Sequence, residues 1–329
     1  MLNSTNNRLS VDNLAQLKLR YWVYAIEGAV LAICNLPIFV AVVRQRLLRS
    51  RKEYLISAAV LLVNGLMGVA SLVGGLMRNY YIITQTANER KSRWQCFWSL
   101  FRQLWMCTDI LHPVAVLIVS IDRLLAIIAP FRYFTFATNY AYGLMALGFG
   151  CGSFFYLLAV ITTYSYQEEL YPKLCFLDYS LAPEFNVLLV TFRFLFFATS
   201  IILYIFIVVL YRSKKSRILP EQQTAARKAE TKRQRKMTVS LGISAFCTFL
   251  FALTPSVWDL RGALLPSFQA ETAIGPILVI LFHLDPLADT FIFTFRHLEF
   301  RMAFVWLLKC RQFSPNCVEQ AKRARVTKK

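Results

Sequence analysis

Residues 105–133 read WMCTDILHPVAVLIVSIDRLLAIIAPFRY, and this stretch decides the fold. It begins with a long apolar run and ends in an acid beside an arginine, Asp122 and Arg123. Ionisable groups near lipid usually face the helix bundle and pair with one another. Pro130 cannot continue a helix, so it predicts a helix end with Tyr133 in the next loop. The stretch predicts a membrane helix that ends in a paired Asp-Arg; the competing interpretation is a simple helix cap with bases nearby.

The composition of the whole chain is that of a membrane protein. Of its 329 residues, 57% are hydrophobic and 17% are charged. A soluble domain has about 45–50% apolar and about 25% charged residues. The net charge is +19, but the bases lie between apolar blocks and no polar lysine-rich domain exists. The composition therefore excludes a soluble nucleic-acid-binding protein, and a lipid bilayer is the expected surrounding.

Seven apolar blocks are long enough to cross a bilayer. Each has about 20 residues or more, which as a helix spans a hydrocarbon core of about 30 Å. They cover residues 22–43, 54–77, 97–129, 141–163, 186–211, 237–258 and 272–295. The sequence predicts an all-α membrane protein with seven transmembrane helices. We expect an extracellular N-terminus at 1–21, a seven-transmembrane domain at 22–295, a short interfacial helix at 296–310 and a basic cytoplasmic tail at 311–329.

The distribution of basic residues predicts the orientation. One set of connecting segments and helix ends carries 26 of the 37 Lys and Arg residues, and positive charge collects on the cytoplasmic side. The N-terminus is therefore expected outside the cell and the tail in the cytoplasm of a plasma-membrane protein. Asn3 begins a glycosylation sequon on the outer side. No signal-peptide pattern precedes the first block, so we expect that helix to insert by itself.

The cysteines divide according to this topology. Only Cys96 and Cys175 fall at the outer surface, where thiols oxidise. They form one possible bridge, and the alternative is that both stay free. Cys310 ends the expected interfacial helix, where it is placed for palmitoylation or stays an unmodified thiol. The basic segment 212–236 is either a topology signal or a surface for a cytoplasmic partner.

The segment 120–133 resembles the end of helix 3 in the rhodopsin-like G-protein-coupled receptors. That family shows Asp-Arg-Tyr-x-Ala-Ile-x-x-Pro-x-x-Tyr at this place. Matching residues are Asp122, Arg123, Ala126, Ile127, Pro130 and Tyr133, while Leu124 replaces the tyrosine. Residues 289–301 are similar to the end of helix 7 and the start of helix 8. The eroded motifs, with the Glu-Tyr-Leu-Ile start of the second block, resemble the nematode chemosensory branch.

The resemblance implies three groups of functional residues inside the bundle. The coupling switch to a heterotrimeric G protein would comprise Asp122, Arg123, Pro130 and Tyr133. A polar core would comprise Asn35, Asn64 and Asp289, with Asp289 either its hub or a merely structural, protonated group. A switch in helices 6 and 7 would comprise Phe249, Pro255 and Phe293, with Leu253 in place of the family's tryptophan and Phe293 in place of its tyrosine.

The resemblance also implies a pocket for an extracellular small molecule or peptide between the outer halves of helices 3, 5, 6 and 7. Candidate residues there are Arg102, Trp105, Asp109, Arg193, His283 and Asp285. Trp105 stands where amine receptors place an aspartate, which disfavours a biogenic amine. Two inward arginines favour an acidic ligand; alternatively, Arg102, Asp109 and Arg193 pair with one another as inert structure.

Other classes of protein lack their signatures here. No zinc spacing, P-loop or dinucleotide fingerprint occurs, so we expect no enzyme, no cofactor and no metal. Segment 272–295 contains no lysine for a retinal Schiff base. A seven-span ligand-gated ion channel, or a non-signalling protein of receptor fold, is the alternative to a chemosensory receptor.

Overall fold

The computed structural model describes residues 11–167, 170–176, 180–216, 239, 242–264, 274–296 and 302. Several expectations fall outside the described residues: the glycosylation of Asn3, the palmitoylation of Cys310 and the tail at 311–329. The interfacial helix expected at 296–310 lies outside them too, apart from its first residue and Met302.

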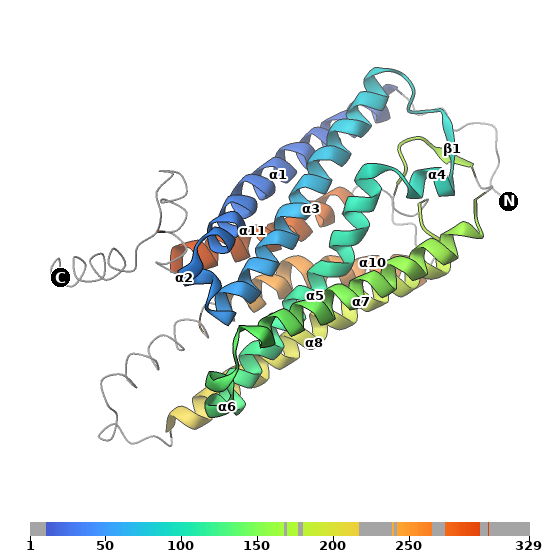
Figure 1. The fold of residues 1–329 in the computed structure, drawn as a ribbon. Helices are drawn as coiled ribbons and strands as arrows, with labels where there is room; N and C mark the ends of the chain where they lie inside the picture. The colour runs from blue at the N-terminus through green and yellow to red at the C-terminus, as the bar shows by residue number, and fades with distance from the viewer. Residues whose placement is uncertain are drawn as a thin grey trace.

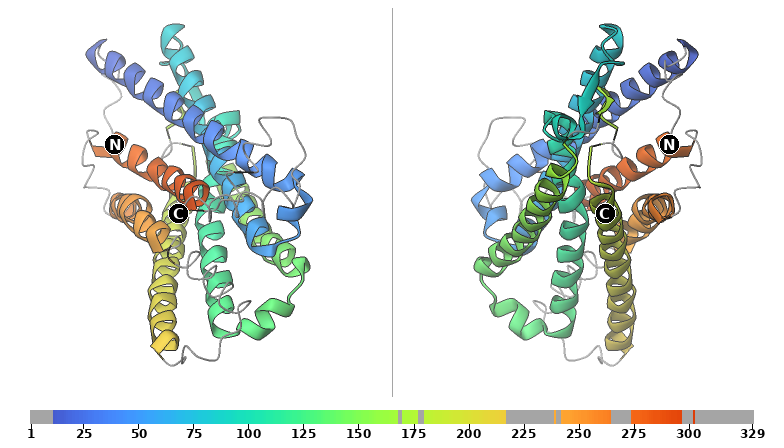
Figure 2. Two further views of the ribbon diagram at one scale, coloured as in Figure 1. Left: turned by 90° about the vertical axis from the view of Figure 1, so that its left-hand side faces the viewer. Right: turned by 90° about the vertical axis from the view of Figure 1, so that its right-hand side faces the viewer.

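The described chain is a bundle of long helices lying side by side (Figure 1). The long helices are α1 (Val11–Arg44), α3 (Lys52–Ile83), α5 (Leu100–Ile128), α7 (Thr138–Tyr164), α8 (Pro183–Ser216), α10 (Thr254–Leu264) and α11 (Ile274–Arg296). Short helices are α2 (Arg46–Arg49), α4 (Arg93–Phe97) and α6 (Pro130–Thr135). The strands β1 (Arg90–Ser92) and β2 (Leu170–Pro172) pair antiparallel. In both views of Figure 2, α10 lies beside α8, and α11 lies beside α10.

Six helical stretches in the described residues are long and apolar enough to cross a membrane. The sixth, Gly242–Leu264, contains helical residues 242–248, the π-helical turn η3 (Phe249–Leu253) and α10. The chain is therefore a multi-pass membrane protein. The helix α11 packs in the same bundle and contacts α1, α3 and α10.

The first helix is longer than its apolar block. It begins at Val11, whereas the block begins at residue 22. The added turns are amphipathic, and Leu14 and Leu17 pack against a cluster that contains Tyr81 and Leu174. This burial extends the helix beyond the apolar block, because a helix end is stabilised by packing as well as by its own composition.

Glycines bring α1 and α3 into close contact. A Cβ atom added at Gly68 would lie 2.5 Å from the backbone nitrogen of Ala32 and 2.7 Å from the carbonyl oxygen of Gly28. Small residues at such contacts let membrane helices approach closely and gain van der Waals packing. The spacing of these two helices therefore depends on Gly68 keeping no side chain.

A disulfide joins Cys96, in α4, to Cys175, after β2, as the sequence predicts. Arg78 of α3 fastens the same loop by donating Nε to the carbonyl of Leu174 (3.0 Å) and Nη2 to that of Cys175 (3.2 Å). We call this the disulfide end of the bundle and the opposite one the Asp-Arg end.

Pro255, one of the expected switch residues, follows a π-helical turn in the structure. The turn η3 ends two residues before Pro255. Proline has no N–H to donate, and its ring would clash with the carbonyl four residues earlier, so the helix widens by one residue. The side chain of Phe249, on this turn, is 47% exposed.

We expect Gly68→Ala to lower the free energy of unfolding by about 1–3 kcal/mol, the usual cost of overpacking. The reason is that the added methyl group would push α1 away from α3. The measurement is thermal unfolding of the detergent-solubilised protein. Gly150→Ala is the matched control, since nothing lies within 4 Å of a Cβ atom at Gly150. Equal stability of the two variants would contradict this account of the α1–α3 contact.

Candidate functional site

A buried carboxylate at the Asp-Arg end is bound from two sides. Asp122 has no exposed surface, and its Oδ2 lies 2.9 Å from Nη2 of Arg123. The hydroxyl of Tyr133 donates to both Asp122 oxygens, at 3.1 and 3.2 Å. Burial raises the pKa of Tyr133, so its hydroxyl stays protonated and remains a donor near neutral pH. The carboxylate of Asp122 thus loses its hydration on folding and is bound instead by the Arg123 cation and the Tyr133 hydroxyl.

The expected loop after Pro130 is a short helix instead. Pro130 is the first residue of α6, a position where its missing N–H costs no hydrogen bond and its fixed φ suits a helix. The chain therefore turns and re-enters a helix, and this helix carries Tyr133 back towards Asp122. The correction has a clear cause: proline ends one helix but also starts another.

Lys52, which the sequence interpretation missed, fastens α6 to α3. Its ammonium group donates to the backbone carbonyls of Tyr133 and Phe136, the second at 3.2 Å. It also lies 3.7 Å from the centre of the Tyr133 ring. We call Asp122, Arg123, Tyr133 and Lys52 the Asp-Arg cluster. In the sequence, Lys52 is one of several bases just before an apolar block, and this pattern predicts membrane topology only.

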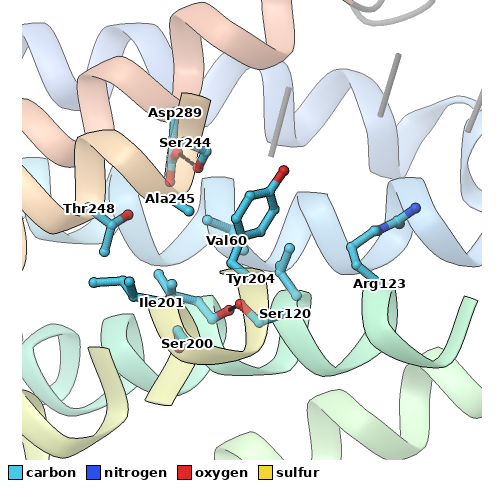
Figure 3. A pocket seen from close by; sticks show the side chains of 12 residues that line it. Val60, Ser120, Arg123, Ser200, Ile201, Tyr204, Ser244, Ala245, Thr248 and Asp289 are labelled. Carbon is cyan, nitrogen blue, oxygen red and sulfur yellow. Dashed lines mark hydrogen bonds between the residues drawn. The ribbon is translucent and has the colours of Figure 1, made fainter. Parts of the chain in front are cut away.

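A cavity that is partly open to solvent lies next to Arg123 (Figure 3). Hydroxyl-bearing and charged side chains contribute to its lining along with apolar ones. The lining residues are Val60, Val116, Val119, Ser120, Arg123, Ser200, Ile201, Tyr204, Ser244, Ala245, Thr248 and Asp289. Figure 3 shows Tyr204 between Arg123 and the Ser244–Asp289 pair. The side chain of Tyr204 therefore lies between Arg123 and the cavity residues of the sixth helix and α11.

The three residues of the expected polar core do not bond to one another. The hydroxyl of Thr290 donates to Oδ1 of Asn35 (2.5 Å), while Asp289 accepts a hydrogen bond from Ser244. Asn64 is fully buried, and its side-chain amide has no hydrogen-bond partner among the described residues. Two successive residues of α11 thus bind two different helices, α1 and the sixth helix.

Arg193 of α8 joins three helices in the half of the bundle nearer the disulfide end. Its Nη1 donates to Oδ1 of Asp109 at 3.0 Å, and its Nη2 donates to Oδ2 of Asp259 in α10. We call these three residues the arginine triad. Arg102 is also buried but does not pair with Asp109. The side chain of Phe293, the other helix 7 candidate, is outside the described part of the chain.

His283 and Asp285 point to different partners. Nδ1 of His283 lies 3.0 Å from Oε2 of Glu27, and Nε2 lies 3.0 Å from the hydroxyl of Ser71. Trp105 packs with its ring centre 5.7 Å from that of His283. Among the candidate pocket residues, His283 and Trp105 therefore meet directly.

Asp285 accepts a hydrogen bond from Thr248 at 3.0 Å, and its other oxygen lies 3.8 Å from Nε2 of His112. The sequence interpretation missed Glu27, His112 and Asp259. Glu27 and His112 are ionisable residues inside apolar blocks, so the signal that singled out Asp109 was present for them as well. Asp259 directly follows a block, where acids are common, and only folding brings it to Arg193.

The comparison with known families identifies a receptor family. The family described as "Serpentine type 7TM GPCR chemoreceptor Srsx" matches residues 29–308. The chain is also similar to melanocortin receptor 5 of Pan troglodytes, with 21% identity over 333 residues. That alignment covers 96% of this chain and 94% of the receptor.

Replacing Lys52 by methionine should lower the free energy of unfolding by about 1.5–3 kcal/mol, because hydrogen bonds made by a charged group are lost. Thermal unfolding of the solubilised protein measures the effect. Arg51→Met removes a neighbouring base that lies 5.8 Å from the Tyr54 ring and should cost much less. If the two variants unfold at the same temperature, Lys52 does not hold α6 in place.

Proposed function

The chain belongs to the Srsx family of serpentine 7TM GPCR chemoreceptors, and we propose that it passes binding of an extracellular ligand to a heterotrimeric G protein. It is a G-protein-coupled receptor, because its family is one of chemoreceptors of this class. The observation that carries the mechanism is the buried Asp122–Arg123 pair beside a cavity.

We propose α11 as the seventh membrane span. Its 23 residues rise about 1.5 Å each, which is enough to cross a hydrocarbon core of about 30 Å. The excess of Lys and Arg supports an orientation in the plasma membrane with the Asp-Arg end in the cytoplasm and the disulfide end outside. The disulfide supports this orientation, because such bonds persist in oxidising surroundings.

In the structure, Arg123 is held by Asp122 and the cavity is bordered by the sixth helix at Ser244, Ala245 and Thr248. An outward movement of this helix would widen the cavity and open it to the cytoplasm. The π turn and Pro255 provide the place for such a bend, since both interrupt the regular hydrogen-bond ladder. Arg123 would then leave Asp122 and face the inserted segment of the G protein.

The ligand acts through its different affinities for the two states of the bundle. It shifts the population towards the open state only by as much as it binds that state more tightly. The polar groups near the disulfide end link α1, α3, α5, α8, α10 and α11, so a ligand among them would change how these helices sit together. At the Asp-Arg end, the hydrogen bonds of Tyr133 and Lys52 stabilise the closed state of the bundle.

The central test is a pair of substitutions in the Asp-Arg cluster. Arg123→Ala should abolish G-protein signalling in cells while leaving surface expression intact. Asp122→Asn should raise basal signalling about tenfold, since it removes the charge that holds Arg123, a bond of about 1.5–3 kcal/mol. Arg132→Ala is the control, because Arg132 is an exposed base on α6, the short helix that also carries Tyr133. Full signalling by Arg123→Ala would refute the proposed coupling.

A second test concerns Asp289 as the hub of the switch. Asp289→Asn and Ser244→Ala should change basal signalling in the same direction, because asparagine replaces the charged acceptor by a neutral one and alanine removes the donor of the same hydrogen bond. The double variant should show no further change, as expected for two residues that act through one contact. If Asp289→Asn leaves both the basal and the ligand-driven signal unchanged, Asp289 is a structural residue only.

A further inference from the structure

We propose that Arg193 is the anchor for a ligand with a carboxylate group, which binds by taking the place of Asp259. This inference rests on the proposed receptor function and specifies the chemical class of its ligand. Arg193 is 4% exposed and lies between Asp109 of α5 and Asp259 of α10. A buried cation placed between two helices is a functional candidate within a membrane bundle.

The hydrogen bonding of Arg193 is incomplete. Nη1 donates to Asp109 and Nη2 donates to Asp259, but Nε is buried and has no acceptor among the residues that the structure describes. A buried donor without a partner is costly, because it has lost its water and gained nothing in exchange. Arg193 therefore offers one unused hydrogen bond inside the bundle.

The geometry of a guanidinium group identifies what would use this donor best. Its Nε–H and Nη2–H point in parallel along one edge and match the two oxygens of a carboxylate. Asp259 binds at Nη2 through Oδ2 and leaves Nε unused. A ligand carboxylate could bind both donors at once. It would exchange a one-point contact for a two-point contact without changing the charge around Arg193.

Burial decides which of the two acids is exchanged. The side chain of Asp109 is 5% exposed, whereas that of Asp259 is 40% exposed. Releasing Asp109 would leave a buried carboxylate without its cation, which is strongly unfavourable. Asp259 can turn to its exposed side and be hydrated. The exchange therefore removes the ion pair between α10 and α8 and keeps α5 joined to α8.

Aromatic rings next to Arg193 indicate the rest of the ligand. The guanidinium carbon lies 5.3 Å from the centre of the Phe282 ring. Phe282 packs against Phe197 and His112, with ring centres 6.2 and 5.8 Å away. These rings favour an acid with an aromatic or aliphatic body. A ligand ammonium group is disfavoured because Arg193 already occupies the space between the acids.

The exchange also explains how binding would reach the Asp-Arg end. Asp259 lies one helical turn beyond Pro255, while Ser244 and Thr248 line the cavity on the other side of the π turn. Loss of the Asp259–Arg193 bond removes one of the contacts that hold the outer part of this helix against α8. Its inner part, beyond the π turn, would then move away from Arg123.

The first experiment tests the anchor without knowledge of the natural ligand. In Asp259→Ala, acetate should replace the missing carboxylate and raise the melting temperature of the purified full-length receptor by about 3 °C. Acetamide should not, because it is neutral. Combining Asp259→Ala with Arg193→Lys should abolish the acetate effect, since lysine keeps the charge but loses the two-donor edge. Equal shifts with acetate and acetamide would overturn the proposal.

The second experiment uses the unmodified receptor. Benzoate, indole-3-acetate and decanoate are compared with their primary amides by melting temperature and by a G-protein reporter. At least one acid should act at about tenfold lower concentration than its amide, the effect of hydrogen bonds to a charged group. Arg193→Lys should remove this preference. If no acid exceeds its amide in either measurement, Arg193 is not a ligand anchor.

The two measurements separate this inference from the proposed function. A melting shift with acids, without any reporter signal even in Asp122→Asn, would support the anchor and contradict G-protein coupling. A reporter response to amines or amides, but not to acids, would support coupling and overturn the carboxylate anchor. Raised basal signalling in Asp259→Ala, lost on adding Arg123→Ala, would support both.

Discussion

Asp122 is a fully buried carboxylate in a mainly apolar chain, and much of the Asp-Arg end follows from the need to bind it. An unpaired charge there would be very costly, so the neighbouring Arg123 supplies the opposite charge and Tyr133 supplies a hydrogen bond. Tyr133 reaches Asp122 only because α6 turns back against the bundle. Lys52 in turn holds α6 through its backbone carbonyls and through the Tyr133 ring.

The same constraint acts along the bundle. His283 is bound by Glu27 and Ser71, Thr290 by Asn35, and Arg193 by two aspartates. Each polar contact joins helices that are distant in sequence, because an apolar bundle offers polar side chains few other partners. Under the proposed function, these contacts are the places where a ligand would compete, and the two states of the bundle would differ in these pairings.

Sequence patterns predicted the features that depend on one segment at a time. Apolar length predicted six helices that the structure shows as long and apolar enough to cross a membrane, and the outer location of Cys96 and Cys175 predicted their bond. The motif around Asp122 and Arg123 indicated the receptor family, which the family match to residues 29–308 confirmed. The start of the first helix at Val11 was not predicted, because its extra turns are stabilised by contacts with Tyr81 and Leu174 rather than by their own apolarity.

The sequence by itself determined that this chain is a multi-pass helical membrane protein with an Asp-Arg pair at a helix end, because length, apolarity and adjacent residues are local properties. Only the tertiary structure decided which distant groups meet. Folding brought Lys52 into hydrogen-bonding contact with α6 and Asp259 with Arg193. It also gave Asn35 a hydrogen bond from Thr290 rather than from the expected Asp289. The physical reason is that a polar side chain in an apolar bundle takes the partner that helix packing brings within hydrogen-bonding distance, and packing depends on the whole chain.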